Sequence, residues 1–364
     1  MQITSIKALL LKLPLDRPVA SAVSRGARPL TSIMMPVVHV HTDVGLTGLG
    51  YAWCFSGGKA MVSLLEEDFA PALIGADPLD HERLWQELYW RFQGIGRHGL
   101  TIQAQSAIDL ALWDLKGKAC QQPVYKLLGG TRDRTPVYGS DGGWLNMSVD
   151  EVVWAAREYL DQGMRGIKLK VGHADPSIDV DRVRRIRKLL GDDVWIAVDA
   201  NQKWDFPTAL RMGREFEQLG IAWYEEPMIC EDVGGHARLS AALDVPIALG
   251  ETLGSRFEID AYLQADAVDI VQPDVTRVGG ITEAVRIAAL CEAAHRPVEP
   301  HLMMEASVHL ACGLPGVDGL EYMPWLTSAF AEAPQLEDGH LVAPQSPGLG
   351  LEVAAHVIER HRIG

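Results

Sequence analysis

The sequence predicts an α/β protein in which a barrel of alternating strands and helices follows a small α+β domain. Three observations lead to this prediction. The first 60 or so residues are typical of strands, and the segment that follows, to about residue 127, has a helical period. From about residue 136, eight short apolar segments alternate with amphipathic stretches. Seven of these eight segments end in ionisable side chains.

The N-terminal part begins with strand patterns. Residues 37–42 are β-rich, residues 43–45 form a Gly turn and residues 46–53 return, which predicts a hairpin. Residues 1–18 are typical of a strand rather than a signal peptide, because a lysine and a proline interrupt their apolar run. Residues 104–118 carry apolar side chains at helical spacing and predict an amphipathic helix.

The later part predicts eight strands separated by helices. Their spacing of roughly 20 to 29 residues and their number favour a (β/α)8-type barrel over an open doubly wound sheet. Ser148 and Glu151 form a capping box before the first helix of this part. The strand segments are residues 137–141, 166–171, 194–199, 221–226, 245–251, 268–273, 296–301 and 318–322.

Three parts are therefore expected along the chain. Residues 1–127 form the N-terminal α+β domain, and residues 128–322 form the barrel. Residues 323–364 continue past the last barrel strand through a Pro/Gly-rich stretch and a short helix, and we expect them to return to the first domain.

Composition excludes several classes of function. The 364 residues include 33 Lys and Arg against 48 Asp and Glu, a formal net charge of −15, which disfavours nucleic acid and anionic membranes as partners. The five cysteines are odd in number and widely spaced, which indicates reduced thiols rather than disulfides or structural zinc. No apolar run is long enough to span a membrane, so a cytoplasmic protein is expected.

Catalytic residues of such barrels lie at the carboxyl ends of the strands. Any one ionisable residue there could be a helix cap or a loop residue, but seven consecutive strand ends of this kind predict a site. In chain order they carry Lys168 and Lys170, Asp199 and Asn201, Glu225 and Glu226, Glu251, Asp274, His301, and Glu321.

Asp199, Glu225 and Glu251 indicate a metal site. Three carboxylates on neighbouring strands repel one another, and their pKa values would rise unless a cation lay between them. All-oxygen ligands suit Mg²⁺, with Mn²⁺ as the alternative, rather than zinc. One Mg²⁺ per active site is therefore expected, and a solvated acidic rim is the competing interpretation.

Two bases are expected beside this cation. Lys168 and Lys170 share one face of their strand, and two close ammonium groups lower each other's pKa, so one is expected to be neutral near pH 7. On the other side, Asp274 would fix the tautomer of His301 and support its charged form.

This arrangement suits removal of a proton α to a carboxylate, with the cation stabilising the enediolate. Glu321, if protonated, would donate a further hydrogen bond. Return of a proton on the other face would give a racemase or epimerase, and loss of a β-hydroxyl would give a dehydratase. A non-catalytic barrel that keeps the metal for binding or assembly is a third hypothesis, although it needs neither base.

These motifs resemble the enolase superfamily and, within it, the mandelate racemase subgroup, over nearly the whole chain. The resemblance implies a modified (β/α)7β TIM-type barrel with an N-terminal α+β capping domain. It implies Lys170 and the His301–Asp274 dyad as the two bases, with Lys168 as the modulator of Lys170. It also implies a homo-oligomer, often an octamer. The matching residues, in family order, are Lys168-x-Lys170, Asp199-x-Asn201, Glu225-Glu226-Pro227, Gly250-Glu251, Asp274, His301 and Glu321, with Mg²⁺ expected on Asp199, Glu225 and Glu251.

Within that subgroup the chain is most similar to L-talarate/galactarate dehydratases, in residues 138–144, 166–172, 271–280 and 300–301. The expected activity is that of an acid sugar dehydratase, which forms a 2-keto-3-deoxy acid from a galactarate- or talarate-like diacid or a similar aldonate. Ser307 stands where those dehydratases are expected to have a histidine and mandelate racemase a serine, which keeps a 2-hydroxy acid racemase or epimerase open.

Distal substrate contacts are expected from the capping loops, roughly residues 17–30 and 53–58. Arg25 and Arg28 would meet a second carboxylate, or they are solvated loop charges. Trp53 is expected in the pocket wall or the core, and Asn201 is expected to bind substrate.

Overall fold

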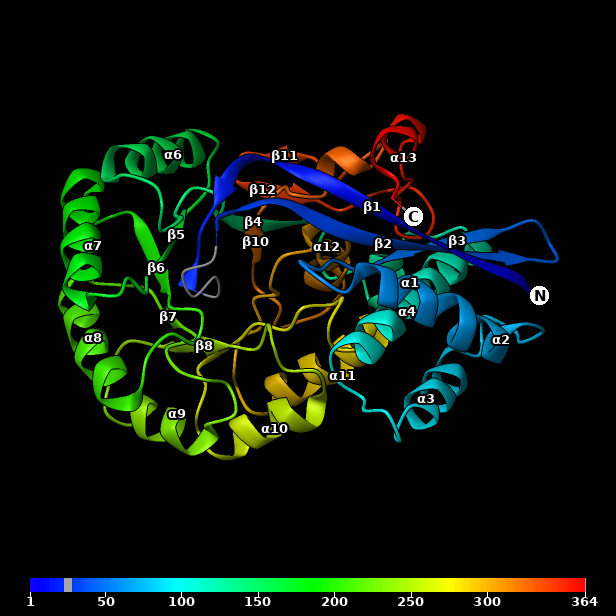
Figure 1. Cartoon of the computed structure of the whole chain (residues 1–364), viewed down its shortest axis with the longest axis horizontal. Coiled ribbons are helices and arrows are strands. Elements are labelled where there is room, and N and C mark those ends of the chain that lie inside the picture. The colour runs from blue at the N-terminus through cyan, green and yellow to red at the C-terminus, as the bar shows by residue number, and fades with distance from the viewer. Residues whose placement is uncertain (23–27, 364) are drawn as a thin grey trace.

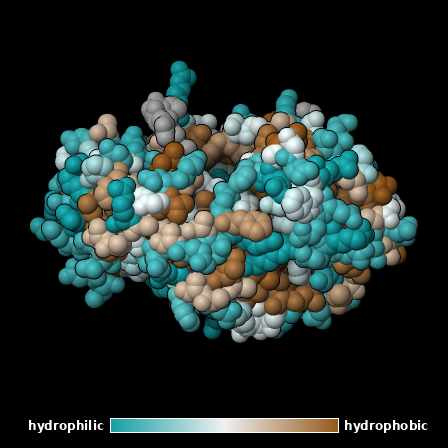
Figure 2. All heavy atoms as spheres, turned by 90° about the horizontal axis from the view of Figure 1, so that it is seen from below, coloured by the Kyte–Doolittle hydropathy of each residue, from teal (hydrophilic) through white to brown (hydrophobic). Residues whose placement is uncertain are grey.

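A three-stranded antiparallel sheet and a ring of parallel strands organise the chain, which a computed structural model describes over residues 1–22 and 28–363 (Figure 1). The mixed α/β class and the barrel with its N-terminal cap are confirmed. Hydrophilic side chains cover much of the face shown in Figure 2, with apolar patches between them. Within the described residues, no helix combines the length and the apolar character needed to cross a bilayer.

The cap is built on strands β1 (Ile3–Val19), β2 (Leu30–Thr42) and β3 (Thr47–Tyr51), paired in that order. The predicted hairpin is confirmed, because β2 and β3 pair in antiparallel register. The end of the long β1–β2 pair extends from the cap toward the barrel (Figure 1). The cap helices are α1 (Gly58–Leu64), η2 (Leu65–Phe69), α2 (Ala70–Leu73), α3 (His81–Arg91), α4 (Leu100–Cys120) and α5 (Val124–Leu128).

Helix α4 includes the segment that was predicted to be an amphipathic helix. It is buried on nearly all sides, so the prediction of an exposed polar face is wrong. The cap sheet covers one side of the helix and the barrel helix α11 (Gly280–Ala293) covers another. The sheet approaches so closely that a Cβ on Gly50 would lie 1.8 Å from the carbonyl oxygen of Ala107. Glycine is therefore required where β3 crosses this helix.

The barrel strands run parallel from β4 to β9, and β10 pairs with β4 to close the ring. The predicted seventh strand, residues 296–301, is reduced to bridges from Val298 to Val271 and to Val317. Pro297 and Pro300 flank this residue and remove the backbone donors that a longer strand would need. The strands are β4 (Arg134–Gly139), β5 (Gly166–Lys170), β6 (Trp195–Asp199), β7 (Tyr224–Glu225), β8 (Ile247–Leu249), β9 (Ile270–Val271) and β10 (Leu320–Tyr322).

Helices surround the ring (Figure 1). The predicted capping box is confirmed, since Ser148 Oγ accepts from the backbone N–H of Glu151 and the Glu151 carboxylate accepts from the N–H of Ser148. Besides α11, the helices are α6 (Val149–Asp161), α7 (Pro176–Leu190), α8 (Phe206–Gln218), α9 (Val233–Ser240), α10 (Arg256–Gln264) and α12 (Met304–Gly313).

The C-terminal segment contacts both parts. It contains η3 (Thr327–Ala329), β11 (Leu336–Glu337), β12 (His340–Val342) and α13 (Ala355–His361). Strand β12 pairs antiparallel with β4 of the barrel. After α13, the backbone N–H of Ile363 donates to the carbonyl of Leu10 in the cap sheet.

Candidate active site and metal centre

The strand ends of the barrel open into a cavity of about 290 Å³ that both domains line. Lys170, Asn201, Glu251 and His301 contribute from the barrel. Val19, Ser21, Leu30, Trp53 and Phe55 contribute from the cap. Residues of both parts thus surround any molecule in this cavity.

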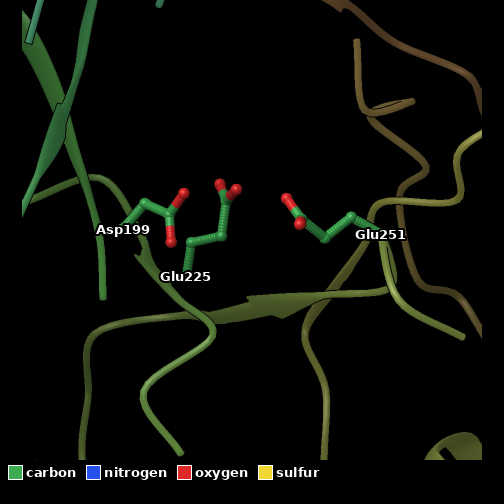
Figure 3. Close-up of side chains that lie close together, drawn as sticks. All are labelled: Asp199, Glu225 and Glu251. Atoms are coloured by element: carbon green, nitrogen blue, oxygen red, sulfur yellow. The ribbon is translucent and has the colours of Figure 1, made fainter. Parts of the chain in front are cut away.

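Asp199, Glu225 and Glu251 turn their carboxylates toward one another (Figure 3), with ligand oxygens all within 4.8 Å. Asp199 ends β6, Glu225 lies beside it on β7, and Glu251 follows β8. All three side chains are buried. An all-carboxylate donor set at parallel strand ends fits a hard divalent cation such as Mg²⁺.

Each of these carboxylates also faces a cationic side chain. Lys168 Nζ lies 2.6 Å from Oε1 of Glu225, and Lys170 pairs with Asp199. His301 Nε2 lies 2.9 Å from Oε2 of Glu251. Lys168 lies within β5, Lys170 ends it, and the histidine follows the Val298 bridge, so the cations approach from different sides.

The pKa values of the two lysines shift in the opposite direction to that expected. Burial lowers the pKa of Lys168, but Glu225 and Glu321 raise it well above its ordinary value. Burial lowers the pKa of Lys170, Asp199 raises it and Lys168 lowers it, with a net rise. In this ion-paired arrangement the facing carboxylates outweigh the second ammonium, so the charged form of each lysine is favoured.

The carboxylates do not titrate alike. Burial raises the pKa of Glu225 to about 7, although Lys168 lies beside it. Burial also raises the pKa of Glu251, but His301 and Arg277 outweigh it and hold this pKa well below its usual range. The expected general rise thus applies to Glu225 and not to Glu251.

His301 and Asp274 form the expected pair. His301 Nδ1 donates to Oδ2 of Asp274 at 3.0 Å, which directs Nε2 toward Glu251. Burial lowers the pKa of His301, but Glu251 and Asp274 raise it to about 10. The imidazolium is therefore the stable form in this arrangement.

Glu321 is an acceptor rather than the expected donor. Its Oε1 accepts from Ser140 Oγ at 2.5 Å and lies 2.8 Å from Lys168 Nζ, and its Oε2 accepts from the N–H of Leu302 at 2.9 Å. Burial raises its pKa, but Lys168, His301 and Lys170 lower it to about 2. The protonated form that donation requires is disfavoured.

Asn201 is held with one polar atom free. Its backbone N–H and its Nδ2 donate to Asp199, while its buried Oδ1 has no partner among the described residues. Its φ of +42° lies in the left-handed region, which asparagine adopts more readily than most other non-glycine residues. The free amide oxygen is therefore available to a donor on a bound molecule.

Of Arg25, Arg28 and Trp53, the three residues predicted in the capping loops to contact substrate, only Trp53 is found at the cavity among the described residues. Trp53 is buried, lines the cavity and donates through Nε1 to Oδ2 of Asp274 at 3.0 Å. Arg28 is exposed and is not among the residues that line the cavity. Arg25 lies outside the described residues.

Sequence reasoning missed several residues of the cavity. The Arg277 guanidinium lies 4.3 Å from the ring centroid of Trp53 and donates to the carbonyl of Glu251 at 3.0 Å. Gln202 Nε2 donates to Glu226 and to Thr252. Gln202, Thr252 and Arg277 each follow a predicted site residue by one to three positions, a signal that could have found them.

Comparison with known proteins identifies both parts of the chain. The mandelate racemase/muconate lactonizing enzyme N-terminal domain matches residues 12–129. The enolase C-terminal domain-like family matches residues 151–357.

Named relatives align over most of their length. L-talarate/galactarate dehydratase of Salmonella typhimurium is 38% identical over 351 residues, covering 96% of this chain and 88% of the relative. Arabinonate dehydratase of Saccharolobus solfataricus is 34% identical, covering 89% of each.

Solved structures agree closely. The Salmonella typhimurium enzyme liganded with Mg and L-lyxarohydroxamate has a TM-score of 0.94 at 38% identity, covering 100% of this chain and 93% of that chain. L-talarate dehydratase from Polaromonas sp. JS666, complexed with Mg and L-glucarate, has a TM-score of 0.93 at 40% identity, covering 100% and 98%.

Proposed function

The chain belongs to the mandelate racemase/muconate lactonizing enzyme family of the enolase superfamily, and we propose that it is a Mg²⁺-dependent acid sugar dehydratase. The observation that carries the proposal is a buried cluster at the cavity, in which three carboxylates face lysines on one side and the histidine of a His–Asp pair on the other. Relatives named as dehydratases of talarate, galactarate and arabinonate support the reaction type.

Asp199, Glu225 and Glu251 would hold the Mg²⁺, in line with the Mg in the related structures. When bound, the cation supplies positive charge that stabilises the negative charge developing on a substrate carboxylate as its α-proton leaves.

Lys170 and His301 are the proposed acid–base pair. Lys170 acts as a base only after it has lost a proton and its ion pair with Asp199. His301 donates through Nδ1 to Asp274, which leaves Nε2 at the cavity, where the imidazolium would protonate a departing β-hydroxyl. Lys168, held between Glu225 and Glu321, places a fixed positive charge beside Lys170.

The reaction removes the proton on C2 and the hydroxyl on C3 as water, and the resulting enol becomes a 2-keto-3-deoxy acid. We propose a galactarate- or talarate-like diacid, or a related aldonate, as the substrate. The free Oδ1 of Asn201 is positioned to accept from a substrate hydroxyl. Arg25 remains a proposed contact for a second carboxylate, whereas the exposed position of Arg28 favours the alternative of a solvated loop charge.

We further propose that the enzyme works in the cytoplasm as a homo-oligomer. Its five cysteines are all free thiols, as a reducing compartment would keep them. Light scattering after gel filtration would measure the assembly, and a monomer at micromolar concentration would contradict that part of the proposal.

The test is a screen of mono- and diacid sugars with Mg²⁺, in which 2-keto acid is detected with semicarbazide. Turnover that is lost in Lys170→Ala and in His301→Asn, and kept in the exposed-lysine control Lys188→Ala, is the expected result. If no keto acid forms but 2-hydroxy acids exchange their α-proton for deuterium in D₂O, the enzyme is a racemase or epimerase instead. Absence of both would indicate a non-catalytic barrel.

A further inference from the structure

Trp53 joins the cap to the His301–Asp274 pair of the barrel. It follows β3 in the cap and is only 3% exposed. Its Nε1–H donates to Oδ2 of Asp274 at 3.0 Å, and the same oxygen accepts from His301 Nδ1 at 3.0 Å. One carboxylate oxygen therefore receives one donor from each domain.

The remaining contacts of Asp274 are local to the barrel. Its Oδ1 accepts from the backbone N–H of Thr276 at 2.8 Å and from the hydroxyl of the same residue at 2.7 Å. The guanidinium of Arg277 lies over the Trp53 ring at 4.3 Å, with Nε 3.7 Å from Oδ2 of Asp274. The indole thus supplies a hydrogen bond to the oxygen that orients His301, and the guanidinium of Arg277 lies against the face of the indole.

A carboxylate orients a histidine only when its own plane is held, because rotation of the carboxylate turns the imidazole with it. We propose that Trp53 is a positioning residue that acts through Asp274 on His301, so that the His301–Asp274 pair is correctly oriented only when the cap is docked. This inference rests on the proposed function for its kinetic consequences, but its geometric consequences do not depend on any substrate.

Two further cap tryptophans allow the role to be separated from simple domain docking. Trp85 Nε1 donates to the carbonyl of Gly279 at 2.8 Å, and Trp113 Nε1 donates to Oγ1 of Thr282 at 2.9 Å. These acceptors follow Asp274 along the same barrel segment, but neither is part of the His–Asp pair. Trp113→Phe therefore removes an indole N–H donor from the same interface, as Trp53→Phe does, but we expect it to leave the orientation of His301 unchanged.

The kinetic test compares Trp53→Phe with Trp113→Phe. Phenylalanine keeps an aromatic ring and removes the N–H donor. In Trp53→Phe, kcat is expected to fall about 10- to 100-fold with KM changed less than about twofold, whereas Trp113→Phe keeps the wild-type kcat. A rise in KM at unchanged kcat would overturn the proposal in favour of direct substrate binding.

A double-variant cycle tests whether Trp53 acts through Asp274. Asp274→Asn combined with Trp53→Phe is expected to be no slower than Asp274→Asn alone, because the second change removes a donor whose partner is already altered. Losses that multiply would contradict the proposed route.

Crystal structures of the two phenylalanine variants distinguish failure of this inference from failure of the proposed function. The planes of Asp274 and His301 are expected to rotate in Trp53→Phe and to stay in place in Trp113→Phe. An unchanged pair in Trp53→Phe overturns the positioning role, whatever the substrate proves to be.

Discussion

The indole Nε1–H of Trp223 donates a hydrogen bond to Oε2 of Glu225 at 3.0 Å, inside the barrel. Gln272 Nε2 donates to the same oxygen at 2.8 Å, while Oε1 faces Lys168. Trp223 packs against Tyr138 and Trp195. The packed barrel interior therefore determines the direction in which this proposed metal ligand points.

We predict that Trp223→Phe weakens Mg²⁺ binding about 10- to 100-fold, because loss of a partner that orients a metal ligand has effects of that size. Isothermal titration calorimetry with Mg²⁺ alone measures the change. Trp204→Phe is the matched control, since the buried Nε1 of Trp204 has no partner among the described residues. Equal affinities in the two variants would show that the Trp223 bond does not orient the ligand.

Mg²⁺ should stabilise the fold by binding to the carboxylates of Asp199, Glu225 and Glu251. At a free concentration of 100 times Kd, one bound ion raises the free energy of unfolding by about 2.7 kcal/mol. The midpoint of thermal unfolding is expected to rise when Mg²⁺ replaces EDTA in the wild type, and to respond much less in Glu251→Gln. A full Mg²⁺ response in that variant would argue against Glu251 as a ligand.

Asp109 makes stability depend on pH at the interface between the domains. This residue of α4 accepts from the backbone N–H of Thr282 at 2.9 Å and from its hydroxyl at 2.6 Å. Burial raises the pKa of Asp109 to about 7, despite these hydrogen bonds. Between about pH 4, where the unfolded carboxyl ionises, and pH 7, the folded state keeps a proton that the unfolded state has lost.

The contribution of Asp109 to the free energy of unfolding therefore falls as pH rises through that window, by up to about 4 kcal/mol. Urea unfolding in EDTA at pH 5 and pH 8 measures the effect. Wild type should lose more stability over this interval than Asp109→Asn, whose amide does not titrate. Parallel pH profiles would show that the pKa of Asp109 is not raised.

Gly50→Ala should destabilise the cap by at least about 2 kcal/mol, because overpacking against a fixed backbone has a cost of this order. The new Cβ would lie 1.8 Å from the carbonyl oxygen of Ala107, so β3 or α4 must move. Gly234→Ala, whose Cβ would have no heavy atom within 4 Å, is the control. Thermal unfolding of both variants is the measurement, and equal midpoints would contradict the close approach.

The sequence alone was enough to predict the barrel and the residues around its mouth. Parallel strands bring their carboxyl ends to one face, so Lys170, Asp199 and Glu225 had to converge once the strands were recognised. The Gly turn at residues 43–45 predicted the hairpin of β2 and β3, because short-range pairing depends on local turn chemistry.

Only the tertiary structure decided what depends on contacts between distant segments. Trp53 meets Asp274, which lies 221 residues further along the chain, because the cap docks on the barrel. The pKa of Lys170 rises because Asp199 forms an ion pair with its ammonium. The spacing of the two lysines along the strand gives no information about that contact. The face of helix α4 that was expected to be exposed is buried, because helix α11 of the barrel packs against it. Periodicity records which side of an element is apolar, whereas burial and charge depend on what packs against that element, and that is a property of the whole fold.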